Sequence, residues 1–173
     1  MPTVPRPPVA AGMALGIGLG GFVDGIVLHQ ILQWHHMLSS TAENPMTTVA
    51  GLERNTLADG LFHAFAWVAV TLGVVLLWRH LRSTAQPAAG SGRSLVGWVL
   101  VGWGAFNVVE GIVNHHLLRL HHVRTDVSSV AAWDLAFLAF GALLVIVGWL
   151  LQRGAHRAYD AEPSAGSRTA VRR

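Results

Sequence analysis

Four long runs of apolar residues, separated by short polar stretches, dominate the chain of 173 residues. A membrane-spanning helix needs about 20 mainly apolar residues, and each run reaches that length. The pattern therefore predicts an all-α integral membrane protein, a four-helix bundle in a single domain at 9–152. The predicted spans are 9–34, 56–78, 95–118 and 130–151. A short tail at 1–8 precedes the domain, and an Arg-rich tail at 153–173, predicted to be disordered, follows it.

Composition agrees with membrane spans and excludes several classes of function. Only 12% of the residues are charged, against about 25% in an ordinary soluble domain. The chain has no cysteine, which excludes disulfides, thiolate metal sites and cysteine nucleophiles. Its basic residues form no groove with interleaved aromatic residues, so nucleic acid is not expected as a partner.

The distribution of arginine predicts the orientation in the membrane. All basic residues are arginine, and most of them lie in the two tails and in the linker between the second and third spans. Cytoplasmic segments carry the excess of basic residues. We therefore expect a multi-pass protein of the plasma membrane with both termini in the cytoplasm. The loops at 34–55 and 119–131 then face outward.

An internal repeat relates the two halves of the chain. Residues 24–36 read DGIVLHQILQWHH and residues 110–122 read EGIVNHHLLRLHH, at a constant offset of 86 and without a gap. Each half would then be one helical hairpin. We expect the two hairpins to be tandem repeats related by a pseudo-twofold axis along the membrane normal.

Every span carries a carboxylate, and most of the histidines lie near the outer ends of the spans. An ionisable group within a span is expensive and marks a functional site by default. At a rise of about 1.5 Å per residue, Asp24 and Glu110 should lie deepest, below two layers of histidines. The predicted metal ligands are His29, His35, His36, His63, His115, His116, His121, His122, Asp59 and Asp134. Asp24 and Glu110 are predicted to orient ligand histidines or to relay protons.

Helix geometry supports most of this set. At about 100° per residue, His29 and His36 fall on one face, and Asp59 and His63 are neighbours one turn apart. His116 falls about 100° beyond His115, so it either faces elsewhere or marks a local distortion of the third span.

The chemistry of these groups indicates a transition metal. Neutral imidazole with carboxylate suits copper(II), iron, zinc or manganese, and we expect copper first, then iron, then zinc. One metal ion needs about three to four protein ligands, and this set exceeds that number. The sequence therefore predicts a polynuclear site near the outer face.

The two histidine motifs, together with DGLFH at 59–63, resemble a bacterial family of predicted membrane proteins, domain of unknown function 2243. The resemblance covers roughly residues 12–152. It implies a four-span protein of the bacterial inner membrane and brings no established activity. The spacing of Asp59 and His63 is also similar to a copper-ligand spacing in one subunit of membrane copper monooxygenases, over five residues only.

Several functions remain open at this point. The first is a membrane oxidoreductase that uses copper or iron. The second is a copper or zinc handling protein that takes its ion from a metal donor or delivers it to a membrane oxidase. The third is a b-type haem bundle, with His29 and either His63 or His115 as axial ligands. A purely structural hydrogen-bonded network is the remaining reading, and a homo-oligomer is possible in each case.

Overall fold

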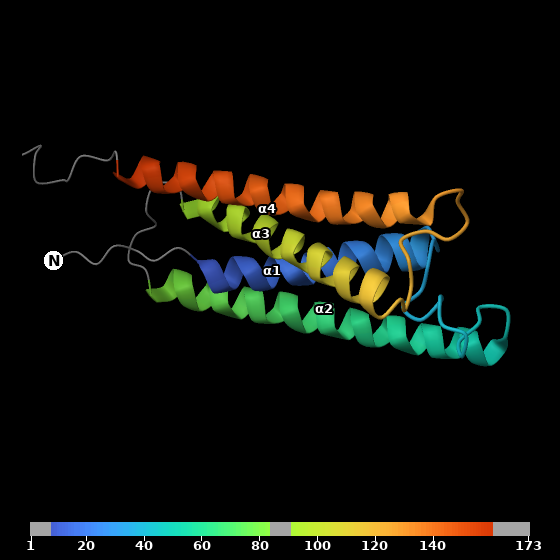
Figure 1. Cartoon of the computed structure of the whole chain (residues 1–173). Helices are drawn as coiled ribbons and strands as arrows, with labels where there is room; N and C mark the ends of the chain where they lie inside the picture. The colour runs from blue at the N-terminus through green and yellow to red at the C-terminus, as the bar shows by residue number, and fades with distance from the viewer. Residues whose placement is uncertain (1–7, 84–90, 161–173) are drawn as a thin grey trace, which may run out of the picture.

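The structure, a computed structural model that describes residues 8–83 and 91–160, is all-α (Figure 1). Four long apolar helices pack together, and two of them continue as wider π-helical segments. The disordered tail was predicted from 153, but the last helix continues to Asp160, and only the part of the tail from 161 onward lies outside the described residues. The elements in chain order are α1 (Val9–Phe22), η1 (Val23–Ile31), α2 (Val49–Ser83), α3 (Ser91–Glu110), η2 (Gly111–Leu117) and α4 (Val130–Asp160).

Each of the four helices is long and apolar enough to cross a membrane, if α1 is counted together with η1 and α3 with η2. Helix α2 begins at Val49, well before the predicted start of the second span at position 56. Its extra turns are fixed by the preceding loop, since Asn55 accepts a hydrogen bond from Leu38 N at 2.9 Å. The Asn55 amide also donates to the carbonyl of Asn44 at 3.1 Å.

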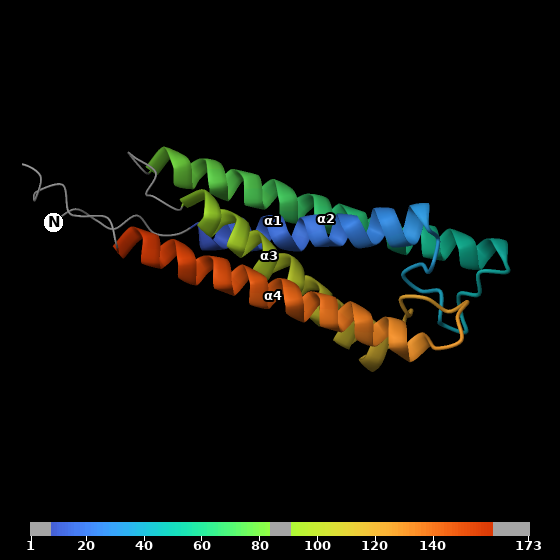
Figure 2. The same cartoon turned by 90° about the horizontal axis from the view of Figure 1, so that it is seen from above.

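Helices α1 and α3 lie between α2 and α4, as both views show (Figures 1 and 2). Among the described residues, α1 packs against α2 and α3, and α3 packs against α1 and α4. Helices α2 and α4 therefore turn most of their surface away from the protein. Large apolar side chains cover that surface, including Leu61, Trp67, Leu135 and Leu143, which are each more than half exposed. Such a surface is suited to contact with lipid.

Glycine allows the two central helices to approach closely. A side chain at Gly16 of α1 would collide with the carbonyl of Val99, and one at Gly102 of α3 would collide with the backbone of Met13. Small residues at a helix interface permit this backbone contact in membrane proteins. The close approach places the inner faces of α1 and α3 against each other over the length that leads to the histidines.

Both central helices widen near their histidine ends and then stop sharply. The final turns close with hydrogen bonds from Leu32 N to Val27 O and from Leu118 N to Val113 O, both 2.8 Å. Gln33 (φ 52°) and Arg119 (φ 51°) follow in the left-handed conformation, which reverses the chain direction. The loops therefore fold back over the helix ends, and they carry the remaining histidines into the bundle.

Candidate metal centre

The histidine end of the bundle is closed by polar side chains. The largest fully buried side chains among the described residues are His29, His115, His121, Asn55, Asp59 and Asp134. Buried polar groups must be paired or must bind a ligand, because leaving them unsatisfied costs several kcal/mol in an apolar setting. This part of the molecule is therefore built around its polar groups.

The Asp24 carboxylate contacts two histidines of the first half of the chain. Its carboxylate lies 3.4 Å from His29 Nε2 and 3.9 Å from His35 Nε2. Asp24 and His29 are five residues apart in η1, where hydrogen bonds link residues five apart, so the two side chains share one face. His35 comes from the loop and reaches the same carboxylate because the chain reverses at Gln33.

The Glu110 carboxylate contacts two histidines of the second half of the chain in the same way. Its carboxylate lies 3.3 Å from His115 Nε2 and 2.8 Å from His121 Nε2. The spacing of five residues from Glu110 to His115 again spans the start of a π-helical segment, and the loop again supplies the second histidine after the reversal at Arg119.

The four imidazoles contact one another across the two halves. The ring centroids of His29 and His35 are 4.4 Å apart, and those of His115 and His121 are 4.9 Å apart. The rings of His35 and His121 stack at 4.7 Å and join the two pairs. We call His29, His35, His115 and His121, with Asp24 and Glu110, the central cluster.

Two subsets of the central cluster have the spacing of metal ligands. The first is His29, His35 and His121, and the second is Glu110, His115 and His121. Within each subset, one ligand atom per residue lies within 4.8 Å of the others, and every residue is buried. The described residues could therefore hold a metal ion here.

A second set of groups orients the imidazoles through Nδ1. His29 Nδ1 lies 2.9 Å from the Asp59 carboxylate. His115 Nδ1 lies 3.5 Å from the Asp134 carboxylate and makes no hydrogen bond in the structure. Backbone carbonyls serve the loop histidines: Val123 O is 2.8 Å from His35 Nδ1, and Met37 O is 3.1 Å from His121 Nδ1. At His29 and His35, the partner at Nδ1 places the proton there and leaves Nε2 as a ligand atom. At His121, Nε2 is hydrogen-bonded to Glu110 at 2.8 Å.

Several inward-facing atoms have no hydrogen-bond partner in the structure, although they are buried. They are Asp24 Oδ2, His29 Nε2, His35 Nε2 and Glu110 Oε2. His35 lies in the loop, where burial, with the nearby imidazoles of His121 and His29, lowers its pKa to about 2. His35 is therefore neutral near pH 7, with a lone pair free on Nε2.

Asp59 and Asp134 also bind the shallower histidines, His36 and His122. His36 Nδ1 lies 2.6 Å from Asp59, and His122 Nδ1 lies 2.7 Å from Asp134. These two histidines are 19% and 28% exposed at the side chain, whereas the four histidines of the central cluster are almost completely buried. They lie at the outer rim of the site.

Two further candidate ligands, His63 and His116, lie neither in the cluster nor at its rim. His63 places Nδ1 2.8 Å from the carbonyl of Asp59, and its Nε2 lies against Gly25, where an added Cβ would be only 2.7 Å away. His116 is exposed on η2. Neither side chain therefore reaches the central cluster.

The depth order differs from the expected layers. Asp24 and Glu110 do not form a floor below the histidines but contact them directly, because the π-helical segments align residues five apart and the loops return into the bundle. Sequence reasoning also missed the carbonyls of Met37 and Val123 as partners of the imidazoles, since no side-chain pattern marks a backbone acceptor.

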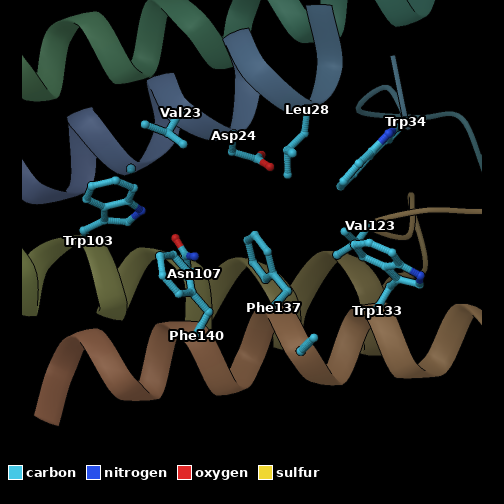
Figure 3. A pocket seen from close by; sticks show the side chains of 12 residues that line it. Val23, Asp24, Leu28, Trp34, Trp103, Asn107, Val123, Trp133, Phe137 and Phe140 are labelled. Carbon is cyan, nitrogen blue, oxygen red and sulfur yellow. The ribbon is translucent and has the colours of Figure 1, made fainter. Parts of the chain in front are cut away.

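A cavity of about 250 Å³ adjoins the cluster on one side (Figure 3). It lies between η1, the ends of the two loops, α3 and α4. Figure 3 shows Asp24 extending from η1 toward this space, with Asn107 and Phe137 opposite. Apart from Asp24 and Asn107, the lining is apolar or aromatic: Gly20, Val23, Leu28, Trp34, Trp103, Val123, Trp133, Ala136, Phe137 and Phe140.

Comparison with known proteins identifies the family. The family model described as predicted membrane protein (DUF2243) matches residues 11–155, which is most of the chain. The chain belongs to this family. It is an integral membrane protein with four candidate spans, and the DUF2243 family has no established function. No curated protein and no solved structure matches the chain.

Proposed function

We propose that this DUF2243 protein is a membrane metalloprotein that binds two transition-metal ions in the central cluster and uses them for redox chemistry. The observation that carries the proposal is the convergence of four imidazole Nε2 atoms and two carboxylates in a buried space. Most of these imidazoles are oriented from behind by a partner at Nδ1. Buried, oriented and unpaired donor atoms are expected of a ligand set.

The geometry favours roles for the four carboxylates that are the reverse of those predicted from the sequence. Asp24 and Glu110 face Nε2 of the histidines, which is the side a metal ion would occupy. Asp59 and Asp134 face Nδ1 and also bind the backbone N–H groups of Met37 and Val123. We therefore assign Asp24 and Glu110 as ligands, and Asp59 and Asp134 as the groups that orient the ligand histidines.

The ligand set favours iron, with copper as the second choice. Asp24 with His29 and His35, and Glu110 with His115 and His121, each supply two imidazoles and one carboxylate. That combination, with coordination positions left open, is typical of iron(II) sites that react with oxygen. The subset of three imidazoles, which includes His121 beside His29 and His35, suits copper(II) or zinc equally well.

We further propose that the two halves are tandem copies of one hairpin. The support is the pairing of contacts at the offset seen in the sequence repeat. Asp24 and His29 correspond to Glu110 and His115, and the reversals at Gln33 and Arg119 also correspond. Each hairpin supplies half of the ligands, so the complete site requires both.

The arginine distribution supports an orientation with the metal centre near the outer face. Helix α1 begins and α4 ends at the end of the bundle opposite the histidine loops (Figure 1). Arg79, Arg82, Arg93 and Arg153 lie at that end, which the positive-inside rule assigns to the cytoplasm.

The structure argues against a haem bundle and leaves metal delivery as the second candidate. The cluster histidines contact one another directly, at ring centroid distances of 4.4 to 4.9 Å, which leaves no slot for a haem macrocycle between those rings. Metal delivery would favour exposed ligands that a partner protein can reach. Only His36 and His122, at the rim, meet that description, so delivery remains the second candidate.

The test is anaerobic loading of the purified protein with ⁵⁷Fe(II), followed by Mössbauer spectroscopy before and after exposure to oxygen. We expect two iron sites per chain that become a coupled diferric pair after oxidation. The variant His121→Ala should lose this signal, and His116→Ala is the matched control because its side chain is exposed. Unbound iron in the native protein, combined with tight binding of copper(II) or zinc, would exclude the iron site.

A further inference from the structure

We propose that the cavity beside Asp24 binds a small aromatic alcohol from the membrane, a molecule with a single ring and a hydroxyl group. Its role as the substrate of the metal centre rests on the proposed function, whereas its binding does not. The case depends on the size of the cavity, on its lining and on two buried polar atoms that have no partner.

The size and lining of the cavity fit one substituted ring. Its volume is about 250 Å³. An apolar cavity of about 150 Å³ is sufficient to bind benzene. Three aromatic side chains, Trp103, Phe137 and Phe140, line the cavity from α3 and α4 (Figure 3). Aromatic walls favour an aromatic occupant through stacked and edge-to-face contacts.

Two polar atoms indicate that the occupant also carries a polar group. Asp24 is 4% exposed and Asn107 is 3% exposed, yet Asp24 Oδ2 and Asn107 Oδ1 have no hydrogen-bond partner. Both residues line the cavity. A hydroxyl group can donate to Asn107 Oδ1, which the metal centre does not use. Asp24 Oδ2 also faces His29 Nε2 at 3.4 Å, on the side assigned to the metal. A purely apolar occupant would leave the Asn107 oxygen unsatisfied.

The cavity occurs where the two halves of the sequence differ. At the offset of the repeat, Gly20 corresponds to Phe106, and Gly21 corresponds to Asn107. On this side, Gly20 lets the Trp103 ring pack against the backbone of α1, since an added Cβ would lie only 2.6 Å from that ring. Asn107 supplies a polar group that Gly21 lacks. The differences therefore place an aromatic wall and a hydrogen-bonding group next to each other.

Two lining tryptophans and an arginine pack together beside the cavity. The rings of Trp34 and Trp133 meet edge to face at 5.1 Å. The Arg124 guanidinium lies 4.9 Å from the Trp34 ring and 5.5 Å from the Trp133 ring. On α4, the lining residues Phe140 (46% exposed) and Ala136 are exposed on the outside of the bundle. We therefore expect the substrate to enter from the lipid.

The proposal is tested by ¹⁹F NMR titration of 4-fluorophenol into the full-length protein in lipid nanodiscs, with empty nanodiscs to correct for partition into lipid. We expect saturable binding that exceeds the binding of fluorobenzene at least tenfold. Ala136→Phe should fill the cavity and weaken binding at least tenfold. Ala139→Phe, on the same helix but outside the lining, is the matched control. Asn107→Leu should reduce the preference for 4-fluorophenol over fluorobenzene.

Three outcomes would overturn the inference: no saturable binding beyond that of empty nanodiscs, equal binding by Ala136→Phe, or equal affinities for 4-fluorophenol and fluorobenzene. The last would indicate an apolar cavity that a lipid chain can fill. Each titration is run with metal-loaded and chelator-treated protein. Metal content and thermal stability of each variant separate loss of the cavity from misfolding. Binding by a native protein that takes up no metal during loading would support the cavity and contradict the proposed function.

Discussion

Nδ1 of His29 lies 2.9 Å from a carboxylate oxygen of Asp59, although the two residues belong to different helices and are both buried. The same carboxylate lies 2.6 Å from Nδ1 of His36 and accepts a hydrogen bond from the backbone N–H of Met37 at 2.9 Å. Asp59 thus ties η1, the following loop and α2 together behind the central cluster. Its effect on metal binding should be indirect and measurable.

Replacement of Asp59 by asparagine should weaken metal binding without abolishing it. The amide preserves the shape of the side chain but removes the charge that orients His29. Loss of such an orienting group costs about 10- to 100-fold in metal affinity. The measurement is competition with a chelator of known affinity, using the full-length protein in detergent. Glu53→Gln, on an exposed turn of the same helix, is the control and should bind as the native protein does. An affinity for Asp59→Asn within twofold of the native value would contradict this role.

Removal of His63 should leave metal binding intact. Its Nδ1 is bound to the Asp59 carbonyl, and its Nε2 faces Gly25 rather than the other imidazoles. We therefore expect His63→Ala to retain the native number of metal ions per chain. By contrast, His115→Ala should lose metal, because that ring contacts His121 at 4.9 Å. Quantitative metal analysis of both variants is the check. Loss of metal in His63→Ala would place His63 among the ligands after all.

Gly25 is expected to be sensitive to a single methyl group. A Cβ at this position would lie 2.7 Å from His63 Nε2, so one of the two elements must move. Overpacking of this kind costs about 1–3 kcal/mol. Gly25→Ala should therefore lower the midpoint of thermal unfolding. In the double variant with His63→Ala, the clash is absent and most of that loss should be recovered. Equal destabilisation in both backgrounds would show that the methyl group acts elsewhere.

The packing of α1 on α3 should control the metal site from a distance. Any side chain at Gly16 collides with the backbone of α3, at the carbonyl of Val99. Gly16→Leu should therefore push the central helices apart, lower thermal stability and reduce metal occupancy together. Gly60→Leu is the matched control, because a Cβ there meets nothing within 4 Å. Native metal content in a destabilised Gly16→Leu would show that the close approach of the helices is not needed for the site.

The sequence predicted the helical class and the membrane residence because apolar length alone determines them. It also singled out each polar residue of the central cluster, since a carboxylate or histidine within an apolar run is rare. What it could not predict was the mutual arrangement of those residues. A standard helix places Asp24 and His29 about 140° apart, and only the π-helical turn brings them onto one face.

The contacts that the carboxylates and the loops make could not be predicted from the sequence either. Asp24 lies deep in its span by residue count, but the chain reverses at Gln33, in a left-handed conformation that is unusual for glutamine. That reversal returns His35 to the same depth. The wall of the cavity also depends on Gly20, which lets Trp103 pack against α1, and the sequence does not reveal that contact.

The most direct test of the metal centre is quantification of bound metals by mass spectrometry. The native protein, His35→Ala combined with His121→Ala, and the control His116→Ala are purified in mild detergent from cells grown with iron, copper and zinc. We predict two transition-metal ions per chain in the native protein and in the control, and none in the double variant. Metal-free native protein that is as stable as the double variant would contradict the metal centre and leave a structural hydrogen-bonded network in its place.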